Sequence, residues 1–154
     1  MSKSKFQNLP ILFGFFFLLC ILSLGIGFSK PPNGTSRFDS RDQQVNSILK
    51  ESCFDCHSTV TQWPFYSRFF PISYFLESHV SEGKAELNFD EFADLSPEQK
   101  LELLKKIETI LDDGTMPPDS YTWMHENSRL TENEIRVLEE WVSKEISHYE
   151  KKIE

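Results

Sequence analysis

Two cysteines and a histidine lie within five residues of one another in the segment Cys53-Phe54-Asp55-Cys56-His57. This C-x-x-C-H spacing is the attachment signature of c-type haem. In such a site each thiol adds to a vinyl group of the porphyrin, and the adjacent histidine reaches the iron from one face. The sequence therefore predicts one covalent haem c, attached through Cys53 and Cys56, with His57 as the proximal iron ligand.

Two other interpretations of the cysteine pair are weaker. A structural zinc site needs two further ligands beside the thiolates, but the next histidine after His57 is His79, so those ligands would be scattered. A redox-active dithiol is expected within a βαβ unit, and the chain shows no convincing strand alternation. Haem attachment therefore remains the favoured interpretation.

The second axial ligand of the iron decides whether such a haem transfers electrons, binds ligands or catalyses a reaction. We favour Met116, because Pro117 and Pro118 prevent a helix there and present the thioether from an extended segment. A thioether opposite imidazole favours ferrous iron and raises the reduction potential. His125 is the alternative distal ligand. His79 lies on an apolar helix face, where a core histidine is more common than a ligand.

Helices are expected on both sides of the signature. A short amphipathic helix begins at Asp42 and leads into the cysteines, and a second helix covers residues 71–80, with Gly83 near its end. Between them, in residues 61–66, the Trp-Pro pair disfavours helix at Trp63. We expect a loop there whose aromatic side chains cover a flat apolar group.

Two further helices are indicated by their capping residues. Ser96 and Gln99 match a capping box with a proline at the first helical position, and Gly114 follows the end of that helix. Thr131 and Glu134 match a second capping box at the start of the last helix. Since no strand pattern or repeat appears, the fold class is predicted to be all-α.

The N-terminal part of the chain is predicted to enter a membrane. Residues 9–28 contain no charge, follow Lys3 and Lys5, and are long enough to span a bilayer. We expect a cytoplasmic N-terminus at residues 1–8, a single transmembrane helix or a cleavable signal at 9–28, a linker at 29–41 and one domain at 42–154. That domain would lie on the periplasmic, extracytoplasmic side. Cys20 is predicted to be a membrane-buried thiol.

The acidic composition restricts the partners of the protein. The chain has 154 residues and a formal net charge of −8, and Lys3 and Lys5 are its only charges before Lys30. The exported part is therefore more acidic than the whole chain, which excludes nucleic acid as a partner. A negative surface can steer a basic redox protein, although no docking patch stands out.

A series of short motifs runs in order through residues 45–143. They are Cys56-His57-Ser58, Trp63-Pro64-Phe65-Tyr66-Ser67, Pro71-Ile72-Ser73-Tyr74, His79-Val80 with Glu82-Gly83, Leu87-Asn88-Phe89, Met116-Pro117-Pro118, Tyr121-Thr122 with His125, and a final helix from Leu130 to Trp141. Together they resemble the bacterial haem-binding domain family.

The resemblance implies a small exported or membrane-anchored monohaem protein with a cytochrome-c-like helical fold. It implies haem attachment at Cys53, Cys56 and His57. We treat the aromatic residues Trp63, Phe65 and Tyr74 as members of the haem pocket. One departure from small class I cytochromes c concerns the leading helix, which offers no glycine or aromatic residue to pack against Trp141.

These observations predict an electron-transfer cytochrome c with redox proteins of unknown identity as partners, and not an enzyme. The alternative is a haem-based gas or redox sensor, or a ligand-binding module, whose sixth iron position is open or weakly held. A peroxidase-like enzyme is disfavoured, because it needs His79 or His125 as a distal acid/base and a positioned arginine, for which Arg68 is the nearest candidate.

Overall fold

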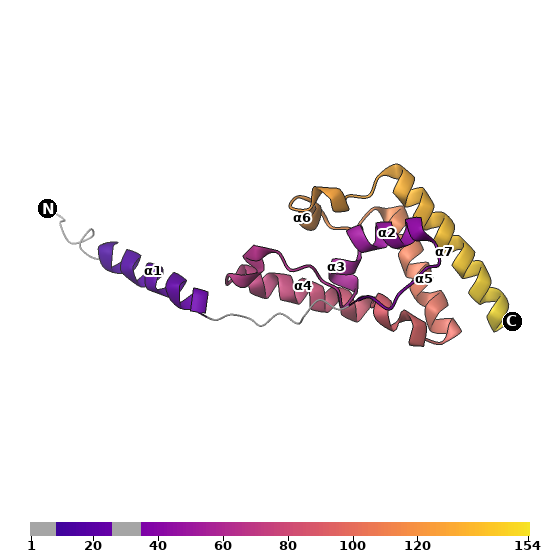
Figure 1. Cartoon of the computed structure of the whole chain (residues 1–154), viewed down its shortest axis with the longest axis horizontal. Helices are drawn as coiled ribbons and strands as arrows, with labels where there is room; N and C mark the ends of the chain where they lie inside the picture. The colour runs from indigo at the N-terminus through magenta and orange to yellow at the C-terminus, as the bar shows by residue number, and fades with distance from the viewer. Residues whose placement is uncertain (1–8, 26–34) are drawn as a thin grey trace. The chain divides into compact units, whose positions relative to one another are not determined.

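A computed structural model of the chain describes residues 9–25 and 35–154 (Figure 1). The elements over these residues are helices and turns, with no strand among them, so the all-α prediction is confirmed. The chain divides into two compact units. Of the described residues, 9–25 and 63–78 belong to the first unit, and 35–62 and 79–154 belong to the second unit.

The apolar N-terminal segment forms helix α1, Leu9–Gly25. Within the described part of the chain, no helix combines the length and the apolar character needed to cross a membrane. The expected cytoplasmic N-terminus at 1–8, the end of the expected span at 26–28 and the linker residues 29–34 lie outside the described residues. The side chain of Cys20 also lies outside them.

Three helices build the core of the second unit: α2 (Gln43–Ser52), α5 (Pro97–Asp113) and α7 (Glu132–Ile153). Helix α5 packs along α7, and α2 also contacts α7 (Figure 1). Each of the three helices contributes an apolar stripe to one cluster. Its buried members on these helices are Val45, Ile48, Leu49, Leu104, Leu111, Leu138, Trp141, Val142 and Ile146.

An aromatic partner for Trp141 comes from outside the leading helix. Phe38 lies in the segment before α2, and its ring centroid is 6.1 Å from that of Trp141 in an edge-to-face arrangement. Phe38 also packs against Phe54 and Phe89. Residues 35–41, which the sequence suggested to be linker, thus belong to the second unit and supply the aromatic residue that α2 lacks.

The long helices begin at the predicted residues. The Asp42 carboxylate accepts hydrogen bonds from two backbone N–H groups in the first turn of α2. Ser96 with Gln99, and Thr131 with Glu134, form complete capping boxes at α5 and α7. Helix α5 ends at a glycine in the left-handed conformation, with φ of 60°.

Helix α4 (Ile72–Glu86) differs from its prediction in length and in its exposed face. The helix continues past residue 80 to Glu86, so Gly83 lies in its last turn, near its end as predicted. His79 is exposed while Val80 is buried. Consecutive helical residues point about 100° apart, so a helix that directs Val80 and Gly83 inward turns His79 toward solvent. The expectation that His79 is a core residue is therefore wrong.

The 63–78 part of the first unit contains η1 (Phe65–Arg68) and the beginning of α4. The 3-10 turn falls partly within the predicted loop, and it is closed by Ser67, whose hydroxyl donates to the Pro64 carbonyl at 2.6 Å. Large side chains around this turn are exposed rather than buried. They are Phe65, Phe69, Phe70, Ile72, Tyr74 and Phe75.

Four short helical turns in the second unit carry or support the candidate site. They are α3 (Phe54–His57), η2 (Phe89–Asp94), α6 (Asp119–Thr122) and η3 (Glu126–Ser128). The signature lies in α3, directly after α2, as predicted. The predicted methionine loop lies between α5 and α6.

Candidate functional site

The C-x-x-C-H signature folds into a single helical turn. Cys53 ends α2 by donating its N–H to the Leu49 carbonyl at 2.9 Å. Its own carbonyl accepts hydrogen bonds from the N–H groups of Cys56 and His57, at 3.2 and 3.0 Å. Residues at positions i, i+3 and i+4 share one face of a helix. The turn therefore presents both thiols and the imidazole on the same side.

Cys53 and Cys56 are free, half-buried thiols. Burial raises the pKa of Cys53 to about 12, with a smaller contribution from the neighbouring Cys56. Burial and the nearby Asp55 carboxylate also raise the pKa of Cys56. A redox-active dithiol needs a cysteine with a lowered pKa, so this environment disfavours that interpretation. Among the described residues, no three Cys, His, Asp or Glu side chains form a group that could hold a metal ion.

The His57 imidazole is held in one orientation by the backbone of α4 and the residue that follows it. Its Nδ1 atom lies 2.8 Å from the Gly83 carbonyl and 3.0 Å from the Leu87 carbonyl. Because both partners are acceptors, Nδ1 carries the proton and donates it. The lone pair is then on Nε2. Metal-bound histidines in proteins are commonly held in this way, so His57 fits the role of a haem-iron ligand.

Gly83 allows α4 to approach the signature closely. A Cβ atom at this position would lie 2.8 Å from the Cys56 carbonyl oxygen and 3.2 Å from the Cys56 Cβ. The atom at 2.8 Å belongs to backbone, which cannot move aside as the end of a flexible side chain can. Glycine is therefore required for the contact that brings the two carbonyl acceptors to His57.

The two residues between the cysteines anchor the turn in different ways. Phe54 is buried, and its ring centroid lies 5.3 Å from that of Phe89 in the core. The Asp55 carboxylate makes polar contacts instead, accepting hydrogen bonds from the Gln62 N–H at 2.8 Å and the Tyr121 hydroxyl at 2.7 Å. The turn is thus fixed by core packing at Phe54 and by polar contacts at Asp55.

Tyr121 and His125 form a stacked pair beside the signature. Their rings lie 4.3 Å apart at the centroids with an interplanar angle of 17°, and the His125 Nδ1 lies 3.1 Å from the Tyr121 carbonyl. Burial raises the pKa of the Tyr121 hydroxyl well above its usual value, and its hydrogen bond to Asp55 raises it further. Tyr121 is therefore a protonated donor at physiological pH.

The other predicted pocket residues occupy two different parts of the chain. Met116 lies in the segment between α5 and α6 and is 44% exposed. Trp63, Phe65 and Tyr74 belong to the first unit. Phe65 and Tyr74 are exposed and Trp63 is half-buried. Their place in a haem pocket stays a prediction.

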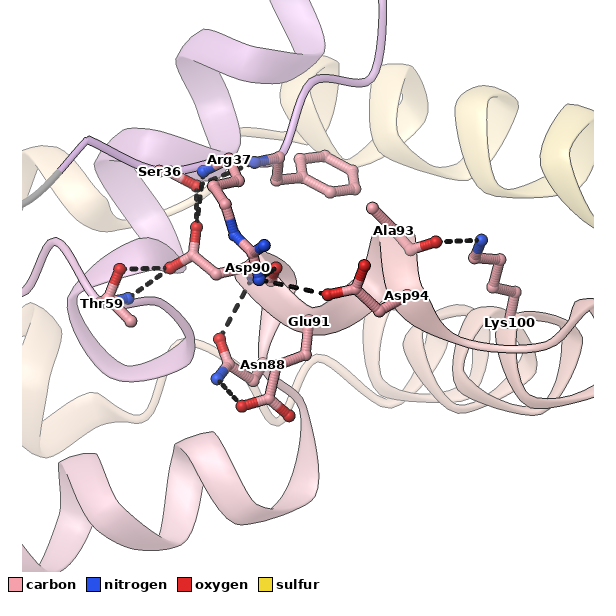
Figure 2. Close-up of polar contacts among 10 residues, drawn as sticks. Ser36, Arg37, Thr59, Asn88, Asp90, Glu91, Ala93, Asp94 and Lys100 are labelled. Atoms are coloured by element: carbon pink, nitrogen blue, oxygen red, sulfur yellow. Dashed lines mark hydrogen bonds and ion pairs between the residues drawn. The ribbon is translucent and has the colours of Figure 1, made fainter.

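A buried carboxylate secures the chain on both sides of the signature (Figure 2). Asp90, only 4% exposed, accepts hydrogen bonds from the hydroxyl and N–H of Thr59, both at 2.6 Å. It also accepts from the Ser36 hydroxyl and the Arg37 N–H, both at 2.7 Å. Asp90 therefore joins η2 to the residues just after His57 and to the segment before α2.

The hydrogen bonds to Asp90 also determine its charge. Burial alone raises the pKa of a carboxyl group, but the donors on Thr59, Ser36 and Arg37 outweigh it and lower the pKa of Asp90 to about 2. The Arg37 guanidinium adds a hydrogen bond to the Asp90 backbone carbonyl at 2.8 Å. Asp90 is therefore ionised over the physiological pH range.

Sequence reasoning assigned no role to Asp55, Gly83, Asp90 or Tyr121. Gly83 carried a usable signal, because a glycine inside a helix costs roughly 0.5–1 kcal/mol and so suggests a close backbone approach. Asp90 carried none, since it is one of 24 acidic residues and belongs to no recognisable motif.

The fold and the site together define a small helical domain with a histidine oriented for haem iron beside two cysteine thiols. The model of the haem-binding domain family matches residues 21–144 of the chain. The chain belongs to the haem-binding domain family, and the protein is a haem-binding protein. No curated protein and no solved structure matches it.

Proposed function

We propose that this protein is a monohaem cytochrome c that carries single electrons between redox proteins, with its haem joined covalently to Cys53 and Cys56. One observation supports this most strongly: the His57 ring shares a helical face with both thiols and is held at Nδ1 by two carbonyls. Bound haem supplies a one-electron couple between ferric and ferrous iron. The protein then needs only to ligate, orient and shield, so we propose an electron carrier rather than an enzyme.

The proposed iron ligands are His57 on the proximal side and Met116 on the distal side, with His125 as the alternative. The hydrogen bonds that His57 donates to Gly83 and Leu87 keep its ring from rotating and increase the basicity of Nε2. Aromatic cover is assigned to Trp63, Phe65 and Tyr74, which would exclude water from the iron and raise the potential.

We also propose that the domain acts on the outer face of the cytoplasmic membrane. The support comes from the sequence, where an uncharged segment at residues 9–28 follows Lys3 and Lys5. The segment would serve as an anchor or as a cleaved signal. Carbonate extraction of membranes separates these, since an anchored protein stays in the pellet and a cleaved one appears in the periplasmic fraction. Recovery in the cytoplasm would refute export.

Covalent attachment is tested by extracting the purified protein with acidified acetone and measuring the pyridine haemochrome. We expect the haem absorbance to remain with the wild-type polypeptide. The double variant Cys53→Ala/Cys56→Ala should release all of its haem, and Cys20→Ala provides a matched control that should retain it. Haem that leaves the wild-type protein in the solvent would show that the attachment is not covalent.

The distal ligand is tested by the near-infrared absorption band that a methionine sulfur bonded to ferric haem iron produces. We expect this band in the wild-type protein and in His125→Ala, and we expect Met116→Ala to lack it. A band that is lost in His125→Ala and kept in Met116→Ala would reverse the assignment.

A second candidate function is a haem-based sensor or ligand-binding module with a weak sixth ligand. Such a protein would bind carbon monoxide rapidly in the reduced state without denaturant. Slow or absent carbon monoxide binding in native buffer supports the electron carrier instead.

A further inference from the structure

The segment that leads from η1 into α4 buries small polar side chains and exposes large apolar ones. Ser67 and Ser73 are each only 1% exposed, while most of the larger side chains around them are exposed. Contiguous exposed apolar residues mark a site that contacts a protein or a membrane. Four of them have no assigned place in the haem pocket, and we call these the apolar face: Phe69, Phe70, Ile72 and Phe75.

The backbone at the start of α4 fixes the apolar face. The Phe69 carbonyl accepts a hydrogen bond from the Ser73 N–H at 2.8 Å, so Phe69 is joined to the first turn of the helix. Ile72 and Phe75 lie three positions apart in α4 and share one side of it. Phe70 is the most exposed member, at 67%. The exposed side chains are thus presented by ordered backbone.

The charge of this segment differs from that of the rest of the chain. Residues 56–76 contain no Asp or Glu, although the chain has 24 of them. The basic residue Arg68 directly precedes the apolar face and is exposed. An anionic lipid surface attracts basic residues and repels acidic ones. This segment can therefore approach such a surface without the repulsion expected elsewhere on an acidic protein.

The chain that would join the domain to a membrane is short. The sequence predicts a linker at 29–41, but the Asp90 carboxylate binds Ser36 and Arg37, so fixed chain begins at residue 36 (Figure 2). Seven residues, 29–35, remain between the predicted span and this fixed chain. Seven residues reach at most about 25 Å even when fully extended. A membrane-anchored domain would therefore stay close to the bilayer.

This tether and the segment with the apolar face leave the second unit from the same place. The Asp90 carboxylate accepts the Ser36 hydroxyl at 2.7 Å and the Thr59 hydroxyl at 2.6 Å, so residues 36 and 59 lie side by side. Residues 59–62 lead directly into Trp63, where the segment 63–78 begins. A short tether at this point keeps the start of that segment near the membrane as well.

We propose that the apolar face binds the surface of the membrane that holds the N-terminal segment. Its side chains lie at the boundary between headgroups and acyl chains, and Arg68 meets the anionic headgroups. Bound in this way, the domain stays at the bilayer surface, which favours redox partners of the same membrane. This inference rests on the proposed membrane anchor.

The test uses the haem-loaded full chain in vesicles of phosphatidylcholine and phosphatidylglycerol. A bimane fluorophore is attached to Phe70→Cys or to Ser147→Cys, an exposed position on α7, each in a Cys20→Ala background. The natural Cys20, labelled in the wild-type chain, reports the anchor. Lipids that carry a nitroxide quench a fluorophore at the same depth. The ratio of fluorescence with and without nitroxide lipid cancels quenching by the haem.

We expect a nitroxide near the headgroups to quench the label at residue 70 and not the label at residue 147. Adding Ile72→Asp and Phe75→Asp to the Phe70→Cys chain should abolish the quenching, because charged side chains do not enter the acyl region. Trp123→Asp is a matched control at an exposed apolar residue outside the face, and it should keep the quenching. If the double aspartate variant does not fold, the comparison of residues 70 and 147 decides the question.

Two results would overturn the inference while the anchor stands, that is, while a mid-chain nitroxide still quenches the label at Cys20. The first is equal quenching at residues 70 and 147. The second is a label at residue 70 that is shielded from aqueous iodide but not quenched by lipid, since a second copy of the chain or the haem then covers the face. If Cys20 is not quenched and the protein does not float with the vesicles, the anchor has failed and the inference fails with it.

Discussion

Replacing Gly83 with alanine tests the link between α4 and the signature. The added Cβ would lie 2.8 Å from the Cys56 carbonyl oxygen, 3.2 Å from the Cys56 Cβ and 3.3 Å from its carbonyl carbon. Two of these three atoms are backbone. Either α4 or α3 must therefore move by a few tenths of an ångström, which will lengthen the hydrogen bonds from His57 to the Gly83 and Leu87 carbonyls.

Two opposing effects set the magnitude. Overpacking a tight contact costs about 1–3 kcal/mol, while exchanging glycine for alanine inside a helix returns roughly 0.5–1 kcal/mol. Since the clash involves backbone, overpacking should dominate. We expect Gly83→Ala to lower the free energy of unfolding by about 1–2 kcal/mol. We also expect a higher reduction potential, because weaker hydrogen bonds from Nδ1 make His57 a less basic ligand.

Urea unfolding followed by circular dichroism gives the stability change, and a redox titration gives the potential. Ser81→Ala is a matched control, since Ser81 is an exposed residue of the same helix and its change alters only helix propensity. If Gly83→Ala proves as stable as Ser81→Ala and keeps the wild-type potential, the close approach of α4 to Cys56 does not control the His57 ligand.

Three further predictions concern stability and are read from urea unfolding. Asp90→Asn should lower the free energy of unfolding by about 2 kcal/mol at pH 7, since its carboxyl pKa falls from 3.8 to about 2 on folding. This contribution is complete above pH 4 and disappears as the pH falls toward 2, so an equal difference at pH 7 and pH 2 would contradict it. Thr131→Ala should cost about 1 kcal/mol through its capping box, with an unchanged haem spectrum; a spectral change would count against a purely local role. Leu104→Ala, at a fully buried position, should cost about 2–5 kcal/mol, and a smaller loss would show that the core collapses around the cavity.

The parts of the fold that follow from local rules were predictable from the sequence. Asp42, Ser96 and Thr131 each satisfy backbone N–H groups within their own first turn. Such contacts depend on residues two or three positions away, so the sequence contains all of the information. The same holds for the signature, because Cys53, Cys56 and His57 come together through a single helical turn.

The parts that depend on distant segments were not predictable. Asp90 binds Ser36, Arg37 and Thr59, which lie more than 30 positions from it along the chain. Tyr121 binds Asp55 across 66 positions. Nothing in a single sequence indicates which of its many carboxylates accepts hydrogen bonds from which donors. The prediction that His79 is a core residue was wrong for the same reason. Which face of α4 is buried depends on where Cys56 lies, and Cys56 belongs to a distant part of the chain.

The carbonyls that hold His57 belong to the last turn of α4 and to the residue after it. The C-terminal end of a helix carries a partial negative charge, equivalent to about half an elementary charge in a long helix. With His57 as the proposed ligand, this end faces the imidazole and stabilises the extra positive charge of oxidised iron. The resulting shift would lower the reduction potential and oppose the effect of a methionine ligand. Since it arises from main-chain dipoles, side-chain substitutions that leave the end of α4 in place would not remove it.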